Sequence, residues 1–486
     1  MSAREKLSAD IHTVIDDPMF AGGGWGISAV DLETGEPVYE LNPTIPLVPG
    51  SIQKSFTTAA VLDILGGDAR LTTPVYATGD LVDGTLIGDL VLVGRGDFSF
   101  GLRDLPDDTL EITSFDHNEA NTGLLPVELN SGDPLSGLRS LAVGLRDNGV
   151  RQVEGDVVVD NHLFGTMLDW PDGRIDSIWI NENVVDVELT ANKVGERPDI
   201  LVIPDLDALS VVNDVTVVAG DAVEVAISMS DMTVTASGTI GIDTVATVRN
   251  AQIPDPVSFA ATAFREVLQQ EGIEVEGTGR ASQTRLDLSA SEPLAEWVSP
   301  PLSEFAKVVQ KISYNRGADL LACLIAVSEG SSDCVDGVAT VLADVHERGG
   351  ENAVRLFDPA GSVDENRSSA QAHVDYLRSV YDEPWGDQFV DLQPIAGVDG
   401  SLVSLGVGTS AVGNIRAKTG TRIHWYPTTK QLFYLARSYA GYVTTESGRE
   451  LAVTVIFNSA TVDDIDAVFA VNNRAADILL ALHKGG

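Results

Sequence analysis

Ser51 and Lys54 have the residue types and the spacing of a serine nucleophile and its general base. They follow the turn-forming pair Pro49-Gly50, and residues 57–65 form an expected helical run. A serine in the first turn of that helix and a lysine one turn later share nearly the same face. An amine beside a hydroxyl, near outward-pointing backbone N–H groups, suits nucleophilic acyl transfer.

This pair alone is a weak signal, because a capping serine followed by a surface lysine gives the same sequence. Lysine is rare here, however: the chain has eight, and only Lys54 has a serine three residues before it. Two later stretches strengthen the hypothesis. Ser313-Tyr314-Asn315 is a polar trio between apolar helical segments, although a capping box would also explain it. Lys418-Thr419-Gly420-Thr421 continues a strand-like run and adds a second amine.

The charge balance disfavours some classes of partner. The 486 residues include 72 Asp and Glu but only 31 Lys and Arg, which gives a formal net charge of −41. Such a charge argues against nucleic acid and against anionic membrane surfaces. With 44% hydrophobic residues the chain is globular, and its length predicts about two to four domains.

The expected location depends on the native start of the protein. No run approaches 18 apolar residues, so we expect no transmembrane segment. The N-terminal residues contain no apolar signal segment. The protein is therefore cytoplasmic if Met1 is the native start, and secreted, periplasmic or in the cell envelope if a leader has been removed.

The pattern of elements changes near residue 66 and again near 295. Short β-rich runs dominate the middle, and 200–250 alternates like a small all-β subdomain. We predict an α+β multidomain protein in which 1–65 and 296–486 form one domain and 66–295 is inserted. In that domain we expect strand 27–31 to pair with the C-terminal strands. The expected helices are 3–16, 135–148, 256–272, 303–312, 318–327, 334–348, 368–381 and 462–483, and the expected strands include 25–31, 37–41, 89–93, 152–159, 214–218, 223–228, 415–421, 438–443 and 450–457.

Two further features allow more than one interpretation. Asp116-His117-Asn118-Glu119 contains metal-ligand types, but a turn with side-chain-to-backbone bonds is favoured about ten to one. Cys323 and Cys334 flank a helix end and could form a disulfide, although two separate buried thiols are as compatible with the sequence.

Taken together and in this order, the three motifs resemble those of the penicillin-recognising serine acyl-transferases. That family comprises penicillin-binding proteins and serine β-lactamases, with Ser-x-x-Lys, Ser-x-Asn and Lys-Thr-Gly on an antiparallel sheet flanked by helices. About 260 residues separate the first two motifs here. So long an insertion resembles the low-molecular-mass class C penicillin-binding proteins, which are D-alanyl-D-alanine carboxypeptidases and endopeptidases. Weaker echoes are Gly88–Asp97, Phe357–Ser362 and Ala396–Gly400.

The chain departs from the family pattern in three places. Tyr314 stands where aspartate is common, and 358–366 is a degraded form of a family motif. Both leave the expected chemistry intact. The segment 418–442 is roughly ten residues longer than usual and adds His424, Trp425 and Tyr426. This extension could reshape the rim of the cleft and change the choice of substrate.

The resemblance implies a mechanism that needs no metal or cofactor. Burial and the charge of Lys418 would lower the pKa of Lys54 from about 10.4, so that it takes the proton of Ser51. The N–H groups of Ser51 and Thr421 would hold the oxyanion, at about 3–4 kcal/mol per donor. Ser313, bonded to Lys54, would relay the proton to the leaving D-alanine, and Asn315 would orient the substrate. Lys418, Thr419 and Thr421, with Gly420 between them, would bind the terminal carboxylate.

The implied function is a D-alanyl-D-alanine carboxypeptidase, possibly an endopeptidase, that acts on peptidoglycan peptides and is inhibited by β-lactams. The same scaffold also supports a β-lactamase, a D-amino-acid-specific peptidase or esterase, and a peptide cyclase. No Glu-x-x-x-Asn segment stands out as a deacylating base, which disfavours the β-lactamase. A catalytically silent envelope-binding module is a more remote alternative, because the catalytic motifs are intact.

Overall fold

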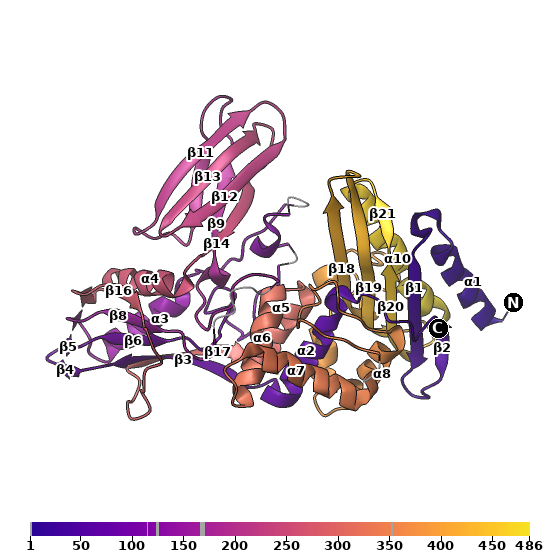
Figure 1. Cartoon of the computed structure of the whole chain (residues 1–486), viewed down its shortest axis with the longest axis horizontal. Coiled ribbons are helices and arrows are strands. Elements are labelled where there is room, and N and C mark those ends of the chain that lie inside the picture. Colours follow the sequence, from indigo (N-terminus) through magenta and orange to yellow (C-terminus); the bar gives the residue numbers. More distant parts are fainter. Residues whose placement is uncertain (1, 114, 123–125, 166–170, 351–352) are drawn as a thin grey trace. The chain divides into compact units, whose positions relative to one another are not determined.

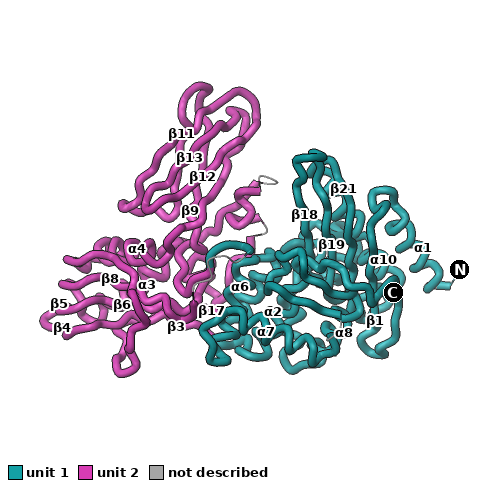
Figure 2. The backbone as a smooth tube through the Cα atoms, viewed as in Figure 1, with its two compact units in different colours: residues 1–69, 168–174, 302–486 teal, residues 70–167, 175–301 magenta. Residues whose placement is uncertain are grey.

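The structure, a computed structural model, describes residues 2–113, 115–122, 126–165, 171–350 and 353–486. It divides into two compact units (Figures 1 and 2). Unit 1 comprises Met1–Ala69, Leu168–Arg174 and Leu302–Gly486, and unit 2 comprises Arg70–Met167 and Ile175–Pro301. The boundaries between the units therefore lie at 69/70 and 301/302. The short segment Leu168–Arg174, between these boundaries in sequence, belongs to unit 1. The domain boundaries at 65/66 and 295/296 remain a prediction.

Unit 1 is built on an antiparallel sheet whose strand order is β18-β19-β20-β1-β2, with β21 paired to β19. The bounds are β18 Ile415–Tyr426, β19 Gln431–Thr444, β20 Glu450–Asn458, β1 Gly24–Asp31, β2 Pro37–Leu41 and β21 Ala460–Val462. Trp25 pairs with Phe457 and Asp31 with Leu451, so the expected pairing of the N-terminal strand with the C-terminal strands is confirmed. Among the described residues β18 ends this order, and the segment 394–396, which is not part of a strand, bonds to its outer edge at residues 415–417.

Helices cover both faces of this sheet. On one face α1 (Ala3–Ile15) and α10 (Ile465–Gly485) lie together (Figure 1), and their apolar residues form one core with the strands. On the other face α8 (Ala370–Tyr381) packs on β1, β19 and β20, and the Tyr442 hydroxyl donates to Leu377 O at 2.8 Å. The sheet is thus the middle layer of a three-layer arrangement.

The helix that follows Ser51 is completely buried over its α-helical part, Lys54–Ala60. It consists of a 3₁₀ turn η2 (Gly50–Gln53), α2 (Lys54–Ala60) and a π turn η3 (Val61–Gly66). Every residue of α2 is buried, because α5, α6 and α7 pack around it. The bounds are α5 Leu302–Lys311, α6 Asn315–Ser328, α7 Cys334–Val345, the π turn η6 His346–Gly350, α9 Gly386–Leu392 and η7 Gly400–Leu402.

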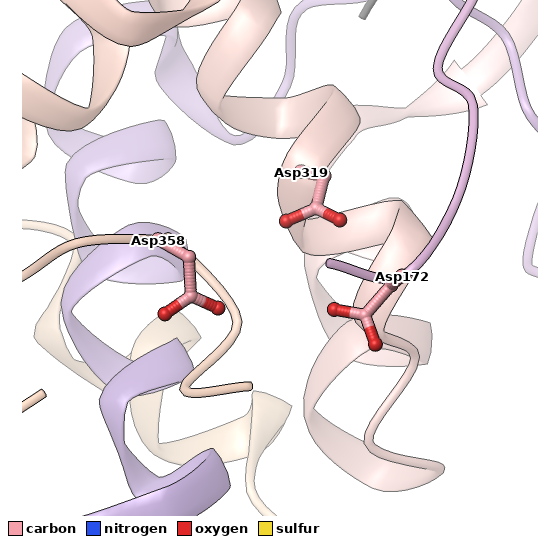
Figure 3. A group of neighbouring side chains, drawn as sticks. All are labelled: Asp172, Asp319 and Asp358. Carbon is pink, nitrogen blue, oxygen red and sulfur yellow. The ribbon is translucent and has the colours of Figure 1, made fainter. Parts of the chain in front are cut away.

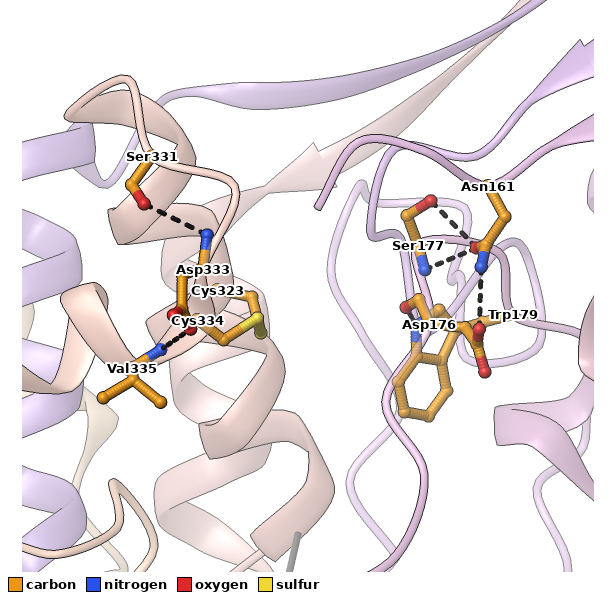
Figure 4. Close-up of a disulfide and its surroundings, with 9 residues drawn as sticks. All are labelled: Asn161, Asp176, Ser177, Trp179, Cys323, Ser331, Asp333, Cys334 and Val335. Carbon is orange, nitrogen blue, oxygen red and sulfur yellow. Dashed lines mark hydrogen bonds between the residues drawn. A yellow bond between two sulfur atoms is a disulfide. The ribbon is translucent and has the colours of Figure 1, made fainter. Parts of the chain in front are cut away.

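Cys323 and Cys334 form a disulfide that joins α6 to α7 (Figure 4). Of the two interpretations left open by the sequence, the bridge is therefore correct. Since α6 begins at Asn315, the disulfide ties the helix that carries this residue to its neighbour.

Unit 2 has an α/β lobe with two sheets and two helices. The larger sheet has the order β16-β8-β6-β3-β17 and the smaller one β15-β7-β5-β4. The expected strand 152–159 is in fact two strands, which enter different sheets and are separated by residues 154–156. The bounds are β3 Arg70–Ala77, β4 Asp80–Val82, β5 Thr85–Ile87, β6 Leu90–Val93, β7 Gln152–Val153, β8 Val157–Asp160, β15 Glu274–Val275, β16 Gly279–Ala281, β17 Ala295–Pro301, α3 Ser136–Asp147 and α4 Pro256–Gln270.

Unit 2 also has a second lobe, which contains residues 200–250. In this range the regular elements are all strands. Its two three-stranded sheets have the orders β10-β9-β14 and β11-β13-β12. The strand β9, which the sequence pattern did not indicate, joins 200–250 to the rest of the unit. The bounds are β9 Val184–Thr190, β10 Asp199–Ile203, β11 Ser210–Val218, β12 Val223–Ser230, β13 Thr233–Gly241 and β14 Thr247–Gln252. The fold is an α+β arrangement of several sheets, as predicted.

Asp116 and His117 belong to a buried cluster of ion pairs. Arg103 pairs with Asp116 at 2.5 Å and with Glu182, and His117 pairs with Glu182 at 3.1 Å and Asp186 at 3.0 Å. Asp116 also accepts from Asn118 N, so the turn interpretation is right for that residue. The sequence did not indicate the cluster, because its members come from three separate segments.

The protonation of His117 makes the stability of this lobe depend on pH. Burial alone would lower the pKa of His117, but the Asp186 and Glu182 carboxylates outweigh burial and raise it well above 6.5. The stabilisation is therefore fully present below the unfolded pKa of about 6.5 and is lost as pH rises through the folded pKa.

We expect His117→Gln to lower the unfolding free energy of unit 2 by about 3 kcal/mol near pH 6, because two carboxylates lose their buried partner. Between about pH 6.5 and pH 9 the thermal midpoint of the parent should fall, and that of the variant should change less. Thermal unfolding followed over this range measures both effects. His12→Gln, which alters an exposed imidazole on α1, is the control. Equal pH slopes in parent and His117→Gln would contradict the assignment.

In the parts of the chain that the structure describes, no helix is both long enough and apolar enough to cross a membrane.

Candidate active site

The Ser51 side chain stands at the surface end of the buried helix, with the Lys54 amine beside it. Gly50 adopts a left-handed conformation (φ 58°), and Ser51 follows it in the 3₁₀ turn. Lys54 Nζ lies 2.9 Å from Ser51 Oγ, although the Lys54 side chain is fully buried. The serine and the lysine of the first motif therefore meet as the helical spacing predicted.

Two oxygens fix the Lys54 amine on its other sides. Asn315 Oδ1 accepts from Nζ at 2.5 Å, and the Ala360 carbonyl accepts at 2.7 Å. A neutral amine has two N–H donors and one lone pair. If the two donors serve Asn315 and Ala360, the lone pair faces Ser51 Oγ. This geometry suits a base that removes the hydroxyl proton.

The loop 357–366 is fastened along the Ser51 helix despite its degraded motif. Gln53 Nε2 donates to Asp358 O, Thr57 Oγ1 donates to Pro359 O at 2.8 Å, and Lys54 donates to the next carbonyl. The loop is also closed on itself by the Asp358 carboxylate, which accepts from Ser362 N and Asn366 Nδ2. Three consecutive carbonyls are thus held against one helix, which positions the base.

Ser313 and Asn315 both come near this centre, but Asn315 makes the contact that was expected of Ser313. Within the described residues no hydrogen bond joins Ser313 to Lys54, so that expectation is wrong for this structure. Ser313 has a positive φ of 64° in the junction between α5 and α6, and Asn315 begins α6. The Asn315 and Ala360 oxygens already take the amine donors that Ser313 would need.

Asn315 is oriented in turn by an acidic residue that sequence reasoning missed. Its Nδ2 donates to Asp172 Oδ1 at 2.8 Å, which turns its Oδ1 toward Lys54. Asp172, Asp319 and Asp358 place one oxygen each within 4.8 Å of one another (Figure 3). Among the residues that the structure describes, these three carboxylates form the group that could bind a shared cation. Asp172 and Asp358 already accept hydrogen bonds from Asn315, Ser362 and Asn366, so the cluster also has a structural role.

The third motif lies on the edge strand β18, beside the Ser51 turn. Lys418 is fully buried, and its Nζ donates to Thr419 O at 2.8 Å. Burial lowers the pKa of Lys418 well below its usual value, and the charges of Lys54 and Arg437 lower it further. Thr419 Oγ1 donates to Ser401 Oγ, whereas Thr421 is exposed.

Arg437 adds a third cation to the site. It lies on β19 opposite Thr421, and its Nη1 donates to Thr421 Oγ1 at 2.7 Å. Its guanidinium also stacks on the Tyr439 ring at 4.4 Å and donates to the Tyr439 hydroxyl. No three-residue motif marks this arginine, and only the strand pairing brings it to the site.

The backbone of β18 approaches the backbone of the Ser51 turn very closely. A Cβ at Gly420 would lie 2.9 Å from Ser51 N, and one at Gly50 would lie 3.4 Å from Thr421 N. Only glycine fits at position 420 without movement of either segment. The N–H groups of Ser51 and Thr421 therefore belong to two segments in contact, as an oxyanion hole requires.

The extension of β18 continues the motif strand to Tyr426. Asp364 Oδ1 accepts from Arg422 Nε at 2.8 Å, and Asp364 Oδ2 lies 2.7 Å from His424 Nε2. These contacts tie the extension to the loop 357–366. Trp425 and Tyr426, at 55% and 47% exposure, present aromatic surface beyond the motif.

Comparisons with known proteins agree with this geometry. A family model described as the D-Ala-D-Ala carboxypeptidase 3 (S13) family matches residues 7–477. A D-alanyl-D-alanine carboxypeptidase of Actinomadura sp. (strain R39) is 27% identical and covers 93% of this chain and 81% of its own length. The crystal structure of penicillin-binding protein 4 of Haemophilus influenzae covers both chains fully, with a TM-score of 0.73 at 20% identity. The same protein in complex with a β-lactam gives a TM-score of 0.70, also at 20% identity and full coverage of both chains.

Proposed function

The chain belongs to the D-Ala-D-Ala carboxypeptidase 3 (S13) family of hydrolases, and we propose that it releases the terminal D-alanine of peptidoglycan stem peptides through an acyl-enzyme on Ser51. The observation that carries this proposal is the 2.9 Å contact between Ser51 Oγ and the buried Lys54 amine, which also donates to Asn315 Oδ1 and Ala360 O.

In the first step Ser51 Oγ attacks the carbonyl of the penultimate residue while Lys54 Nζ takes its proton. Lys54 must be neutral to act as the base. Two ammonium groups close together repel one another, so a charged Lys418 beside Lys54 would support that role. The negative charge that develops on the carbonyl oxygen would be held by the N–H groups of Ser51 and Thr421.

The proton then passes to the nitrogen of the leaving D-alanine. Ser313 remains the proposed relay, because its half-buried hydroxyl has no hydrogen-bond partner in the described part of the chain and is available to substrate. Asn315 would orient Lys54 and the substrate amide. Water finally hydrolyses the ester, with Lys54 as the group placed to activate it.

The substrate carboxylate would bind at β18. Thr419 and Thr421 offer hydroxyls, Lys418 supplies charge from beneath, and Arg437 supports Thr421. An anionic peptide end needs such a local concentration of cations in a chain of net charge −41. We also propose that β-lactams acylate Ser51 as inhibitors and that the chain acts in the cell envelope. The disulfide suits an oxidising compartment.

We expect the protein to release one D-alanine from a soluble peptide that ends in D-Ala-D-Ala and to leave the matched L-Ala-L-Ala peptide intact. Free D-alanine measured by a coupled oxidase assay, with the shortened peptide identified by mass, tests this directly. A cross-linked dimeric muropeptide tests the endopeptidase reaction, whose products are two monomers that are identified by mass. Hydrolysis of penicillin with no peptide turnover would favour the β-lactamase alternative instead.

A further inference from the structure

Unit 2 has a concave site on the face of its larger sheet opposite α3 and α4. Residues that alternate along β6 face opposite sides of the sheet. Leu90 and Leu92 join the core under the helices, whereas Val91 and Val93 belong to a separate small apolar cluster. The segment 285–289 packs over this second face and leaves a pocket of about 530 Å³.

A buried carboxylate holds the wall of the pocket in place. Asp160, at the end of β8, is 3% exposed. Its Oδ2 accepts from Leu286 N at 2.8 Å, and its Oδ1 accepts from His162 N at 3.0 Å and lies 2.8 Å from His162 Nδ1. The other acidic residue of the lining, Asp287, accepts from Ser289 N and Oγ. Both carboxylates therefore accept hydrogen bonds from groups of the pocket's own walls.

The two arginines of the lining are not paired in this way. Arg95 follows β6 and Arg285 lies in the covering segment. Across the described residues neither guanidinium has an ion-pair or hydrogen-bond partner. By contrast, Arg280 on β16 of the same sheet pairs with both Asp89 and Asp156. In a chain with 72 acidic and 31 basic residues, two unpaired guanidiniums in one pocket indicate an external anion.

The other residues that line the pocket indicate what the uncharged part of such a ligand looks like. Tyr76, Leu286 and Leu288 offer aromatic and apolar surface, and His162 and Ser289 add polar groups. A sugar ring has an apolar C–H face and an edge of hydroxyls, so it matches both kinds of surface. The volume is within the range of small-molecule sites.

We propose that this pocket binds an anionic sugar, a hexose-sized ring that carries a carboxylate or a phosphate, through Arg95 and Arg285. The guanidiniums bind the anion, and the sheet face and Tyr76 contact the ring. The site lies wholly within unit 2 and is independent of the reaction at Ser51. It would give the enzyme contact with the glycan or with another acidic wall polymer.

Calorimetric titration of the full chain with four probes tests this proposal. The probes are N-acetylmuramic acid, N-acetylglucosamine 6-phosphate, uncharged N-acetylglucosamine and inorganic phosphate. We expect at least one anionic sugar to bind ten times more tightly than both the uncharged sugar and phosphate. Only an anionic sugar can contact the two guanidiniums and the apolar surface at the same time. Tighter binding of N-acetylmuramic acid would indicate a carboxylated sugar as the natural ligand, and tighter binding of N-acetylglucosamine 6-phosphate would indicate a phosphorylated one.

Arg95→Gln and Arg285→Gln should each weaken this binding at least tenfold. Arg197→Gln, which removes an exposed arginine paired with Asp214 in the same unit, should not change it. Arg285 is exposed, so its variant should keep the thermal midpoint of the parent. Three results would each overturn the proposal: no binding of either anionic sugar up to about 10 mM, equal binding of the uncharged sugar, or affinities unchanged in both pocket variants.

Discussion

Ser51→Ala should abolish covalent labelling by benzylpenicillin and should reduce D-alanine release by about 10⁴-fold or more. The substitution removes the oxygen on which we propose that the acyl-enzyme forms, and loss of a serine nucleophile has effects of this size in serine hydrolases. Intact mass after incubation with penicillin measures the labelling, and the coupled assay measures turnover. The thermal midpoint should change little, because Ser51 is only half-buried and lies at the surface end of its helix.

Ser55→Ala provides a matched control for this experiment. Ser55 lies four residues later on the same helix and is fully buried, and its hydroxyl has no hydrogen-bond partner among the described residues. Its variant should be acylated at the parent rate if it folds. A full adduct on Ser51→Ala, located by peptide mapping, would show that another residue is the nucleophile and would reject the proposed mechanism.

The parts of the site that the sequence predicted are those set by local spacing. A separation of three residues on a helix brings Ser51 and Lys54 together independently of the tertiary structure. The same holds for Lys418 to Thr421, because consecutive residues of one strand stay together. The helices and strands that surround them could also be predicted from periodicity, and the fold class followed from their order.

The residues that the sequence did not predict reach the site through pairing over long distances. Arg437 is placed by its register with Thr421 across the β18–β19 pair, and Asp172 comes from a segment far from Asn315 in sequence. The expected hydrogen bond between Ser313 and Lys54 is absent among the described residues for a related reason. The position of Ser313 in the motif was visible, but the competing acceptor, the Ala360 carbonyl, is a backbone group that any residue could supply.

Unit 2 shows the same division between local and distant determinants. Its two helices and some of its strands follow from local patterns, but β9 does not, and the His117 cluster depends on the meeting of Arg103, Glu182 and Asp186. A lone histidine beside an aspartate is most simply explained by a turn. Only the buried partners raise its pKa and give it an energetic role.

Lys418→Met should reduce the hydrolysis of a peptide with a free D-Ala-D-Ala carboxylate about 100-fold, and that of the matched C-terminal amide by less than about 10-fold. Loss of a charge-assisted interaction accounts for the larger factor. The smaller factor reflects the second role of Lys418, which is to disfavour the charged form of Lys54. Methionine keeps the buried stem, so the core around β18 should remain packed. The ratio of kcat/KM for the two substrates is the quantity to measure.

Two comparisons separate carboxylate recognition from general support of the site. Lys311→Met removes another buried lysine, which pairs with Asp399 at 2.7 Å, and should leave the substrate ratio unchanged. In the parent the preference for the free carboxylate should decline as pH rises through the pKa of Lys418, which burial and two neighbouring cations place well below its usual value. The amide should not show this decline. If Lys418→Met slows both substrates by the same factor, Lys418 acts only on Lys54, and Thr419, Thr421 and Arg437 alone hold the carboxylate.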